Sequence, residues 1–284
     1  MVEVDTTAPS CAIDVDAIYQ SPAWPNTLLG SAADAGGLSS VLISVQRGSD
    51  DLFFNGGGWS GSETFLPATG TSPWLFPLSL GVLSEGVVYT VNCRPLDRAG
   101  NTGVCQAQFE LDDTPPSGTF SIGEGQPVGL NTPFVQLFSE TDDAIEMRIA
   151  NETLNFGSWL AVESPFDWVL VSLDGSRRVR AEFRDLAGNV LALEDTVILD
   201  RNAPVCVIDR EDGAVYTAAT WPETVSGTAT DDRSGLRTAT LTIQNQENGE
   251  YYDGAAWTAV ATEIDISASP WLVNLSTDKL QDGA

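Results

Sequence analysis

The sequence predicts an all-β protein made of small sandwiches joined in tandem. Its 284 residues include 26 Gly and 15 Pro, spread along the whole chain and separated by short runs rich in β-branched residues. That punctuation is typical of strands joined by tight turns. Hydrophobic residues make up 42% of the sequence, which is enough for packed cores. The length suits two or three domains.

Alternating apolar residues mark strands that are buried on one face. They recur at a comparable place in each third of the chain, as Val41, Ile43 and Val45, as Ile145, Met147 and Ile149, and as Ala239, Leu241 and Ile243. Further alternating runs at 89–93 and 105–111 flank the turn Asp97-Arg98-Ala99-Gly100-Asn101, which predicts a hairpin. Roughly seven strands per hundred residues is the size of an immunoglobulin-like sandwich.

Three segments of the chain open in the same way. An apolar run ends in Asp5, Asp112 or Asp200, and a Pro follows within four residues. We therefore predict four parts: residues 1–4 as the end of a preceding repeat, 5–112 as repeat one, 113–200 as a divergent repeat two, and 201–284 as repeat three.

Repeats one and three align at a constant offset of 197 residues. The offset relates Trp24 to Trp221, Gly30 to Gly227, Trp74 to Trp271 and Gly86 to Gly283. At this offset repeat three stops two strands early, so the third sandwich is predicted to be truncated. Trp residues recur in all three repeats, as Trp59, Trp159 and Trp257 and as Trp74, Trp168 and Trp271. We interpret them as packing residues; the alternative is an exposed platform for sugars.

Three motifs carry a resemblance to a known family. The segments Asp200 to Pro204, Gly227 to Gly235 and Asp97 to Asn101 resemble bacterial Ig-like (Big-type) tandem repeat proteins. The resemblance implies a very large secreted or surface adhesin or fibre, often stiffened by calcium, and an extracellular or cell-surface location. Repeat two lacks the Gly-Thr-Ala segment, so the resemblance is weaker there.

The charge excludes several partners. The 40 acidic residues outnumber the 13 basic ones, giving a net charge of −27. Nucleic acids and anionic membranes need clustered Lys and Arg, so neither is an expected partner. No apolar run is long enough for membrane insertion. Such acidity indicates either bound cations or adaptation to high salt.

Acidic residues recur where the chain enters each sandwich and in two loops at the same end. Ca²⁺ prefers six to eight oxygen ligands, so we predict Ca²⁺ as a cofactor at these joints. The candidate ligands are Asp5, Asp34, Asp97 and Asn101 in repeat one, Asp112, Asp113, Asp142, Asp143, Asp185 and Asn189 in and before repeat two, and Asp200, Asp231 and Asp232 in repeat three. The alternative is that the same residues cap turns and stay solvated.

Four cysteines suit an oxidising compartment. Cys11, Cys93 and Cys105 fall on predicted core faces, so one disulfide is expected in repeat one. Cys11–Cys105 is favoured because the first strand often runs beside the last. Cys93–Cys105 remains the alternative because these two face each other across the hairpin. Cys206 matches Cys11, and its partner is expected in the missing strands.

The sequence contains no histidine, which removes His-based triads and most zinc hydrolase sites, and we predict no enzyme activity. The favoured function is a structural spacer or stalk of a secreted or cell-surface adhesin or fibre. The alternatives are a carbohydrate-binding accessory module of a secreted glycan-active protein and a subunit of a strand-exchanging filament. The expected partners are neighbouring repeats, with a surface glycan, a protein receptor or identical subunits as further partners.

Overall fold

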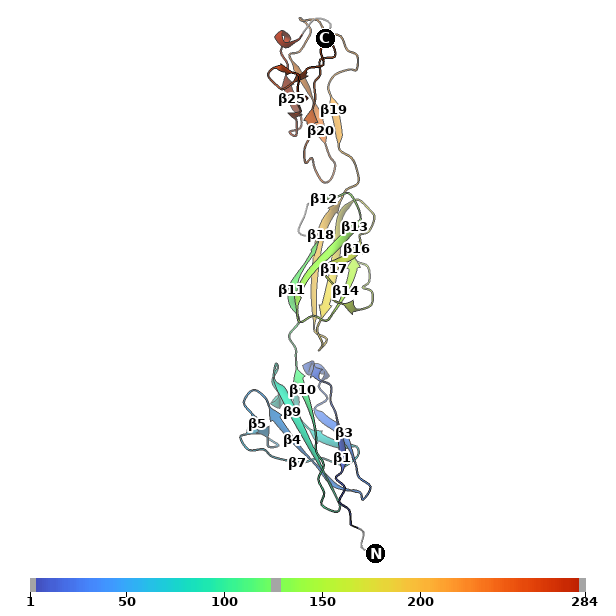
Figure 1. The fold of residues 1–284 in the computed structure, drawn as a ribbon, viewed down its shortest axis with the longest axis vertical. Helices are drawn as coiled ribbons and strands as arrows, with labels where there is room; N and C mark the ends of the chain where they lie inside the picture. Colours follow the sequence, from blue (N-terminus) through green and yellow to red (C-terminus); the bar gives the residue numbers. More distant parts are fainter. Residues whose placement is uncertain (1–3, 124–128, 281–284) are drawn as a thin grey trace.

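The computed structural model describes residues 4–123 and 129–280 and places three β units in a line, with the two termini at opposite ends (Figure 1). Each unit has its own hydrophobic core, drawn from residues 11–111, 120–197 and 221–275. The predicted all-β class is therefore confirmed. Within these described ranges, no helix has the length and apolar character that a membrane span requires.

The first unit is a sandwich of two sheets. One sheet has the order β1 (Ser10–Asp14), β3 (Thr27–Ala33), β8 (Trp74–Pro77). The other has the order β2 (Ile18–Tyr19), β10 (Cys105–Leu111), β9 (Val88–Asp97), β4 (Leu38–Arg47), β5 (Leu52–Phe54), β6 (Trp59–Ser60), with β7 (Leu66–Pro67) beside β4. Short 3₁₀ turns, η1 (Ser21–Ala23) and η2 (Leu80–Val82), complete the unit.

The alternating residues predicted to be buried form the core of this unit. Val41, Ile43 and Val45 on β4 are each at most 1% exposed. β9 and β10 form the predicted hairpin, in which Cys93 lies opposite Cys105. Gly100 in the turn has a φ of 99°, the conformation that favours glycine there.

The first strand is divided between the two sheets. β1 pairs antiparallel with β3, whereas β2 pairs parallel with β10. The expectation that the first strand runs beside the last is therefore right for Ile18–Tyr19 and wrong for the segment that carries Cys11. The chain changes sheets after Asp14, which leaves Cys11 facing β10 across the sandwich.

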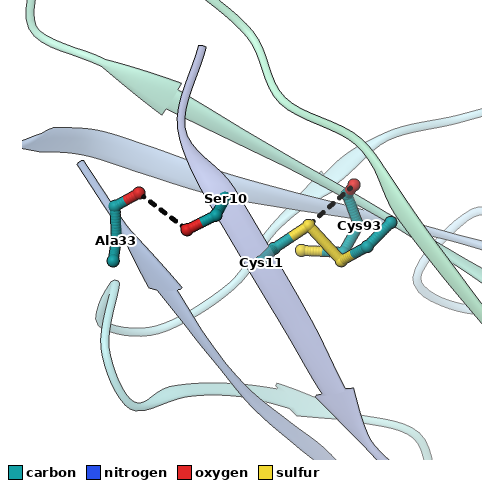
Figure 2. Close-up of a disulfide and its surroundings, with 5 residues drawn as sticks. Ser10, Cys11, Ala33 and Cys93 are labelled. Carbon is teal, nitrogen blue, oxygen red and sulfur yellow. Dashed lines mark hydrogen bonds between the residues drawn. A yellow bond between two sulfur atoms is a disulfide. The ribbon is translucent and has the colours of Figure 1, made fainter. Parts of the chain in front are cut away.

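The predicted disulfide joins Cys11 to Cys105, whose Cα atoms are 5.9 Å apart. Figure 2 shows the bond between the two sulfurs with Cys93 beside it. Cys93 is a buried free thiol, and Cys206 in the third unit is free and exposed. The favoured pairing is confirmed, although it bridges the two sheets and does not join neighbouring strands.

The second unit repeats this plan with fewer strands. One sheet has the order β11 (Ser117–Ile122), β13 (Phe134–Asp142), β16 (Phe166–Val169), and the other β12 (Gly129–Leu130), β18 (Val190–Leu199), β17 (Gly175–Arg184), β14 (Glu146–Asn151), β15 (Leu160–Ala161). Met147 and Ile149 on β14 are buried as predicted. The prediction for Ile145 is wrong: this residue precedes β14 and is 46% exposed.

The third unit has one sheet like those above and only fragments of the other. The sheet has the order β19 (Val205–Ile208), β20 (Thr224–Thr230), β25 (Trp271–Asn274). Facing it are the pairs β21 (Thr240–Leu241) with β24 (Ile264–Asp265) and β22 (Tyr251–Tyr252) with β23 (Trp257–Thr258), followed by η3 (Thr277–Lys279). The described part of this unit, up to 280, has no counterpart of β9 or β10. Gly283, which the offset of 197 relates to Gly86, lies outside the described residues. Residues 1–3, predicted to belong to the end of a preceding repeat, lie outside them as well.

Equivalent side-chain hydrogen bonds in the first and third units are related by the same offset of 197 residues. The Trp24 indole donates to the Leu78 carbonyl oxygen (2.9 Å), and the Trp221 indole donates to the Leu275 carbonyl oxygen (2.6 Å). Both partners in the second pair lie 197 residues after those in the first. All eight Trp residues of the sequence are buried or half-buried, in agreement with their interpretation as packing residues.

Strand register corrects one expected equivalence in repeat two. Trp74 and Trp271 open β8 and β25 directly after a Ser-Pro pair, and in repeat two the residue at that place is Phe166. Trp168, which the sequence appeared to align with Trp74, lies two residues further along β16. Its indole donates to the Asn151 side-chain oxygen over 2.9 Å. The core position is therefore occupied by a smaller aromatic ring.

Candidate functional site

Three clusters of acidic side chains lie at the points where the chain enters the three units. In each cluster the carboxylate oxygens lie within 4.8 Å of one another. The clusters are Asp5, Asp34 and Asp97; Asp112, Asp143 and Asp185; and Asp200, Asp231 and Asp232. Each combines the residue where the chain enters a unit with residues from that unit's own loops.

In the first cluster Asp5 precedes β1, Asp34 follows β3 and Asp97 ends β9. Turn chemistry fixes the buried Asp97, because its Oδ1 accepts the backbone N–H groups of Gly100 (2.6 Å) and Asn101 (2.7 Å). The Asn101 amide donates to Asp97 Oδ2 (2.8 Å) and to the Asp5 carbonyl oxygen (3.1 Å). The hairpin turn thus holds the entering chain in place.

The second cluster has the same construction at the joint between the first two units. Asp185 Oδ1 accepts the backbone N–H groups of Gly188 (2.7 Å) and Asn189 (2.9 Å). The Asn189 amide donates to Asp185 Oδ2 (2.9 Å) and to the carbonyl oxygen of Asp112 (3.0 Å). Asp112, which directly follows β10 of the first unit, is therefore held against the pole of the second.

The third cluster uses a different residue to hold the entering chain. Asp200 directly follows β18, and its Oδ2 accepts both the backbone N–H (3.0 Å) and the hydroxyl (2.8 Å) of Ser234. Asp231 and Asp232 lie in the loop after β20, where Asp231 Oδ1 accepts the N–H of Gly235 (2.8 Å). Ser234 belongs to the Ser-Gly part of the motif quoted above, so that motif contained the signal for its role.

The electrostatic environment differs between the clusters. Burial, followed by the negative charges of Asp185 and Asp143, raises the pKa of Asp112 above its ordinary value. Burial also opposes ionisation of Asp97, but the hydrogen bonds from Asn101 and the turn N–H groups hold its pKa below the ordinary value. The Ser234 hydroxyl lowers the pKa of Asp200. At neutral pH each cluster is therefore a concentration of negative charge.

Two predicted ligands lie outside the clusters. Asp113 accepts the backbone N–H (2.7 Å) and the hydroxyl (2.5 Å) of Ser21, so it links the two units directly. Asp142 is the last residue of β13 and pairs with Ser117 of β11, and it is not among the three clustered carboxylates of this unit.

Asn101 and Asn189 lie beside the first and second clusters. Their amide groups donate hydrogen bonds to the carboxylates, so in this arrangement they orient the predicted ligands. The Asn189 side-chain oxygen accepts from Gln20 of the first unit over 2.7 Å. Sequence reasoning missed Gln20 and Ser21, whose partners lie 169 and 92 residues away with no local motif between them.

The clustered residues fit a hard divalent cation. Ca²⁺–oxygen distances of about 2.3–2.6 Å place oxygens on opposite sides of one ion about 5 Å apart. Oxygens within 4.8 Å of one another can therefore share an ion. Carboxylates suit Ca²⁺, whereas structural zinc sites use Cys and His.

Comparison with known proteins gave structural neighbours alone. No family model matches the chain, and no curated protein matches it. Fibronectin(III)-like modules of Clostridium thermocellum CbhA match with a TM-score of 0.39 and 9% identity over 67% of this chain and 93% of that chain. A 1.5-MDa bacterial ice-binding adhesin matches with a TM-score of 0.39 and 15% identity over 96% of this chain and 88% of that chain. A Ca²⁺-stabilized adhesin of an Antarctic bacterium matches with a TM-score of 0.35 and 13% identity over 96% of this chain and 67% of that chain. Similarity at this level carries no argument about function.

Proposed function

We propose that the chain is a spacer or stalk segment of a secreted or cell-surface adhesin or fibre, and that Ca²⁺ stiffens its joints. The observation that carries the proposal is the recurrence of a three-carboxylate cluster at each point of chain entry. A cation held there would bind the entering chain and the loops of the next unit together. Such an ion restricts rotation between units, which is what a long spacer needs.

Direct contacts at the first joint support a fixed orientation. Asp113 binds Ser21, and Asn189 binds Gln20, so two hydrogen-bonded pairs flank Asp112. Hydrogen bonds of this kind are worth about 1 kcal/mol each, which is too little to prevent bending on their own. An ion shared by three carboxylates would add a stronger constraint at the same place.

The second joint has its own contacts. Arg201, which follows Asp200, forms an ion pair with Asp174 of the second unit over 2.7 Å. An exposed pair of this type contributes little stability. The Asp200 cluster lies beside it, so an ion there would again reinforce a weak contact.

The net charge of −27 is consistent with this proposal. Three carboxylates within 4.8 Å repel one another. At Asp112, burial is the main cause of the raised pKa, and the charges of Asp185 and Asp143 add to it. Neutralisation by a cation would convert that repulsion into attraction. The proposal needs no catalytic role, and the partners it implies are neighbouring repeats.

The carbohydrate-binding alternative has little support from the side chains. This alternative expects some of the repeated Trp residues to be exposed, whereas none of the eight Trp residues is exposed. The filament alternative is favoured by one observation: β19 is an edge strand of its sheet, and all four of its residues are exposed, including Val205 at 60%, Val207 at 48% and Ile208 at 48%. Open strands of this kind recruit partner strands. Sedimentation that shows monomer alone would count against it.

The calcium proposal is tested by melting the chain in low salt with chelator and then with Ca²⁺. Saturating Ca²⁺, at about 100 times its Kd, should stabilise each occupied unit by roughly 2.7 kcal/mol. Asp143→Asn removes one carboxylate at an exposed position with a φ of 67°, which Asn tolerates. This variant should lose most of the shift for the second unit. Glu163→Gln, an exposed acid of the same unit outside the clusters, is the control and should keep it.

Two results would contradict the proposal. The first is a melting temperature of the wild-type protein that does not change when Ca²⁺ is added at low ionic strength. The second is an equal Ca²⁺-induced shift in melting temperature for Asp143→Asn and Glu163→Gln. The second result would indicate general screening of the acidic surface by the cation.

A further inference from the structure

Three sulfur atoms meet in the core of the first unit. Cys11 on β1 is bonded to Cys105 on β10, and Cys93 on β9 lies directly opposite Cys105. Their Sγ atoms all lie within 4.8 Å of one another. The Cys11 sulfur also lies 3.9 Å from the Cys93 carbonyl oxygen (Figure 2). A sulfur in a disulfide has no hydrogen to donate, so this is a packing contact.

The disulfide connects the first and last strands of the unit. Its sequence separation is 94, so residues 12–104 form a covalently closed loop. The chain enters the unit before β1 and leaves it after β10, towards the second unit (Figure 1). A stretching force applied along the array is therefore transmitted from Cys11 through the disulfide to Cys105, and the closed loop carries none of it. The second repeat, residues 113–200, contains no Cys and has no such protection.

We propose that the three cysteines form a thiol–disulfide exchange site that can relocate this cross-link. The Cys93 thiolate attacks Sγ of Cys105, a Cys93–Cys105 bond forms, and the Cys11–Cys105 bond breaks. Cys11 leaves as a thiolate and takes up the proton that Cys93 lost. The number of thiols and disulfides is unchanged, so the step needs no oxidant or reductant.

The product disulfide is geometrically acceptable. Residues directly opposite on antiparallel strands have Cα atoms about 4.5–5.5 Å apart, which lies within the range that disulfides span. The exchange would move the cross-link from between the two sheets to within one sheet. The closed loop would then contain only residues 94–104, and residues 12–92 would become extensible.

Burial keeps the exchange slow in the resting protein. Cys93 is 1% exposed, and desolvation raises its pKa to about 11. The attacking species is the thiolate, which is scarce at neutral pH for such a group. The site is therefore latent until alkaline conditions, or a force that opens the sandwich, ionises or exposes Cys93.

The exchange is tested in solution by following the fate of each Cys at pH 9 with an alkylating reagent and no reductant. Cys206→Ala serves as the background, because it removes the exposed thiol. We expect alkylated Cys11 to accumulate together with a Cys93–Cys105 disulfide. Adding Cys93→Ala should abolish labelling of Cys11. Alkylation of Cys93 with the Cys11–Cys105 bond retained would overturn the proposal, as would labelling of Cys11 in the Cys93→Ala protein.

The mechanical consequence rests on the proposed stalk function, whereas the exchange itself does not. Under constant force the Cys206→Ala protein should extend first by unfolding of the second repeat. A later step of about 290 Å is expected when residues 12–92 are released. Cys93→Ala should remove that step and keep the first one. Two outcomes would contradict this mechanical role of the disulfide: a first unit that extends fully in one step, or a late step that persists in Cys93→Ala. Neither outcome would affect the calcium test.

Discussion

Gly30 lies directly opposite Trp74 on strands β3 and β8, so close that a Cβ at position 30 would lie 2.3 Å from the indole ring. It would also lie 2.2 Å from the carbonyl oxygen of Ala12. Gly227 and Trp271 repeat this relationship in the third unit, with a Cβ-to-indole distance of 2.3 Å. In the second unit Leu137 faces Phe166. A glycine thus pairs with the largest side chain, whereas two medium side chains pair in the divergent repeat.

Gly30→Ala should destabilise the first unit, because the new methyl group meets the backbone on one side and the buried indole on the other. Overpacking of this type costs about 1–3 kcal/mol, which lowers the melting temperature of a domain of this size by roughly 5–10 °C. Calorimetry should show the loss in the first unit alone. Gly57→Ala is the control, since nothing lies within 4 Å of its Cβ. Equal melting of the two variants would contradict the packing argument.

Asp112→Asn should have opposite effects with and without Ca²⁺. The pKa of Asp112 is raised in the folded protein, so any stability that its protonated form provides is lost as pH rises through that pKa. At pH 7 in chelator, removal of the charge should raise the melting temperature of the second unit by about 2–4 °C. With Ca²⁺ the same variant should melt below wild type. In chelator, this increase in melting temperature should disappear near pH 3, where the Asp112 carboxyl of the wild-type protein is protonated. An increase that persists at pH 3 would contradict the electrostatic cause.

Trp159→Ala should weaken the second unit through loss of a cation–π ladder. The guanidinium groups of Arg148 and Arg184 lie 4.4 Å and 4.3 Å from the centroid of the Trp159 ring. We expect a cost of about 1–2 kcal/mol in denaturant unfolding of this unit. Phe134→Ala removes an aromatic side chain that is 70% exposed, and should change stability by less than about 0.5 kcal/mol. Similar losses for both variants would show that the ladder contributes nothing specific.

Ser21→Ala should loosen the first joint without destabilising either unit. The substitution removes the hydroxyl that donates to Asp113 across the joint. One such bond is worth about 1 kcal/mol, enough to broaden the distribution of inter-unit angles seen by small-angle scattering in chelator. Ser49→Ala changes an exposed serine away from the joint and is the control. A distribution identical to that of the control would show that this contact does not restrain the joint.

The core of the array was largely predictable because burial leaves a periodic signal. Val41, Ile43 and Val45 alternate in the sequence and line the core, and the offset of 197 between Trp24 and Trp221 reappears in their hydrogen bonds. The errors occurred where a pattern does not report strand limits. Ile145 continues the alternation of β14 but precedes the strand, and Trp168 matches Trp74 in residue type although Phe166 occupies its position.

The candidate ligands were predictable in type and only partly in membership. Topology places chain entry and two loops at one pole, and nine of the eleven predicted Asp residues meet there in three clusters. Asp113 and Asp142 are adjacent in sequence to cluster members, but Asp113 binds Ser21 of the first unit, and Asp142 ends β13 whereas Asp143 turns away from the strand with a φ of 67°. Sequence proximity therefore cannot decide which carboxylate joins a cluster.

The sequence by itself determined the strand pattern, the repeated joints and the acidic character at each joint, because these depend on residue type and spacing along the chain. Only the tertiary structure decided that Ser21 and Gln20 reach across the joint, that Cys11 crosses between sheets to Cys105, and that Cys93 stays reduced beside them. These contacts join residues 82 to 169 positions apart. They depend on how two sheets and two units pack against each other, and no local sequence pattern encodes that packing.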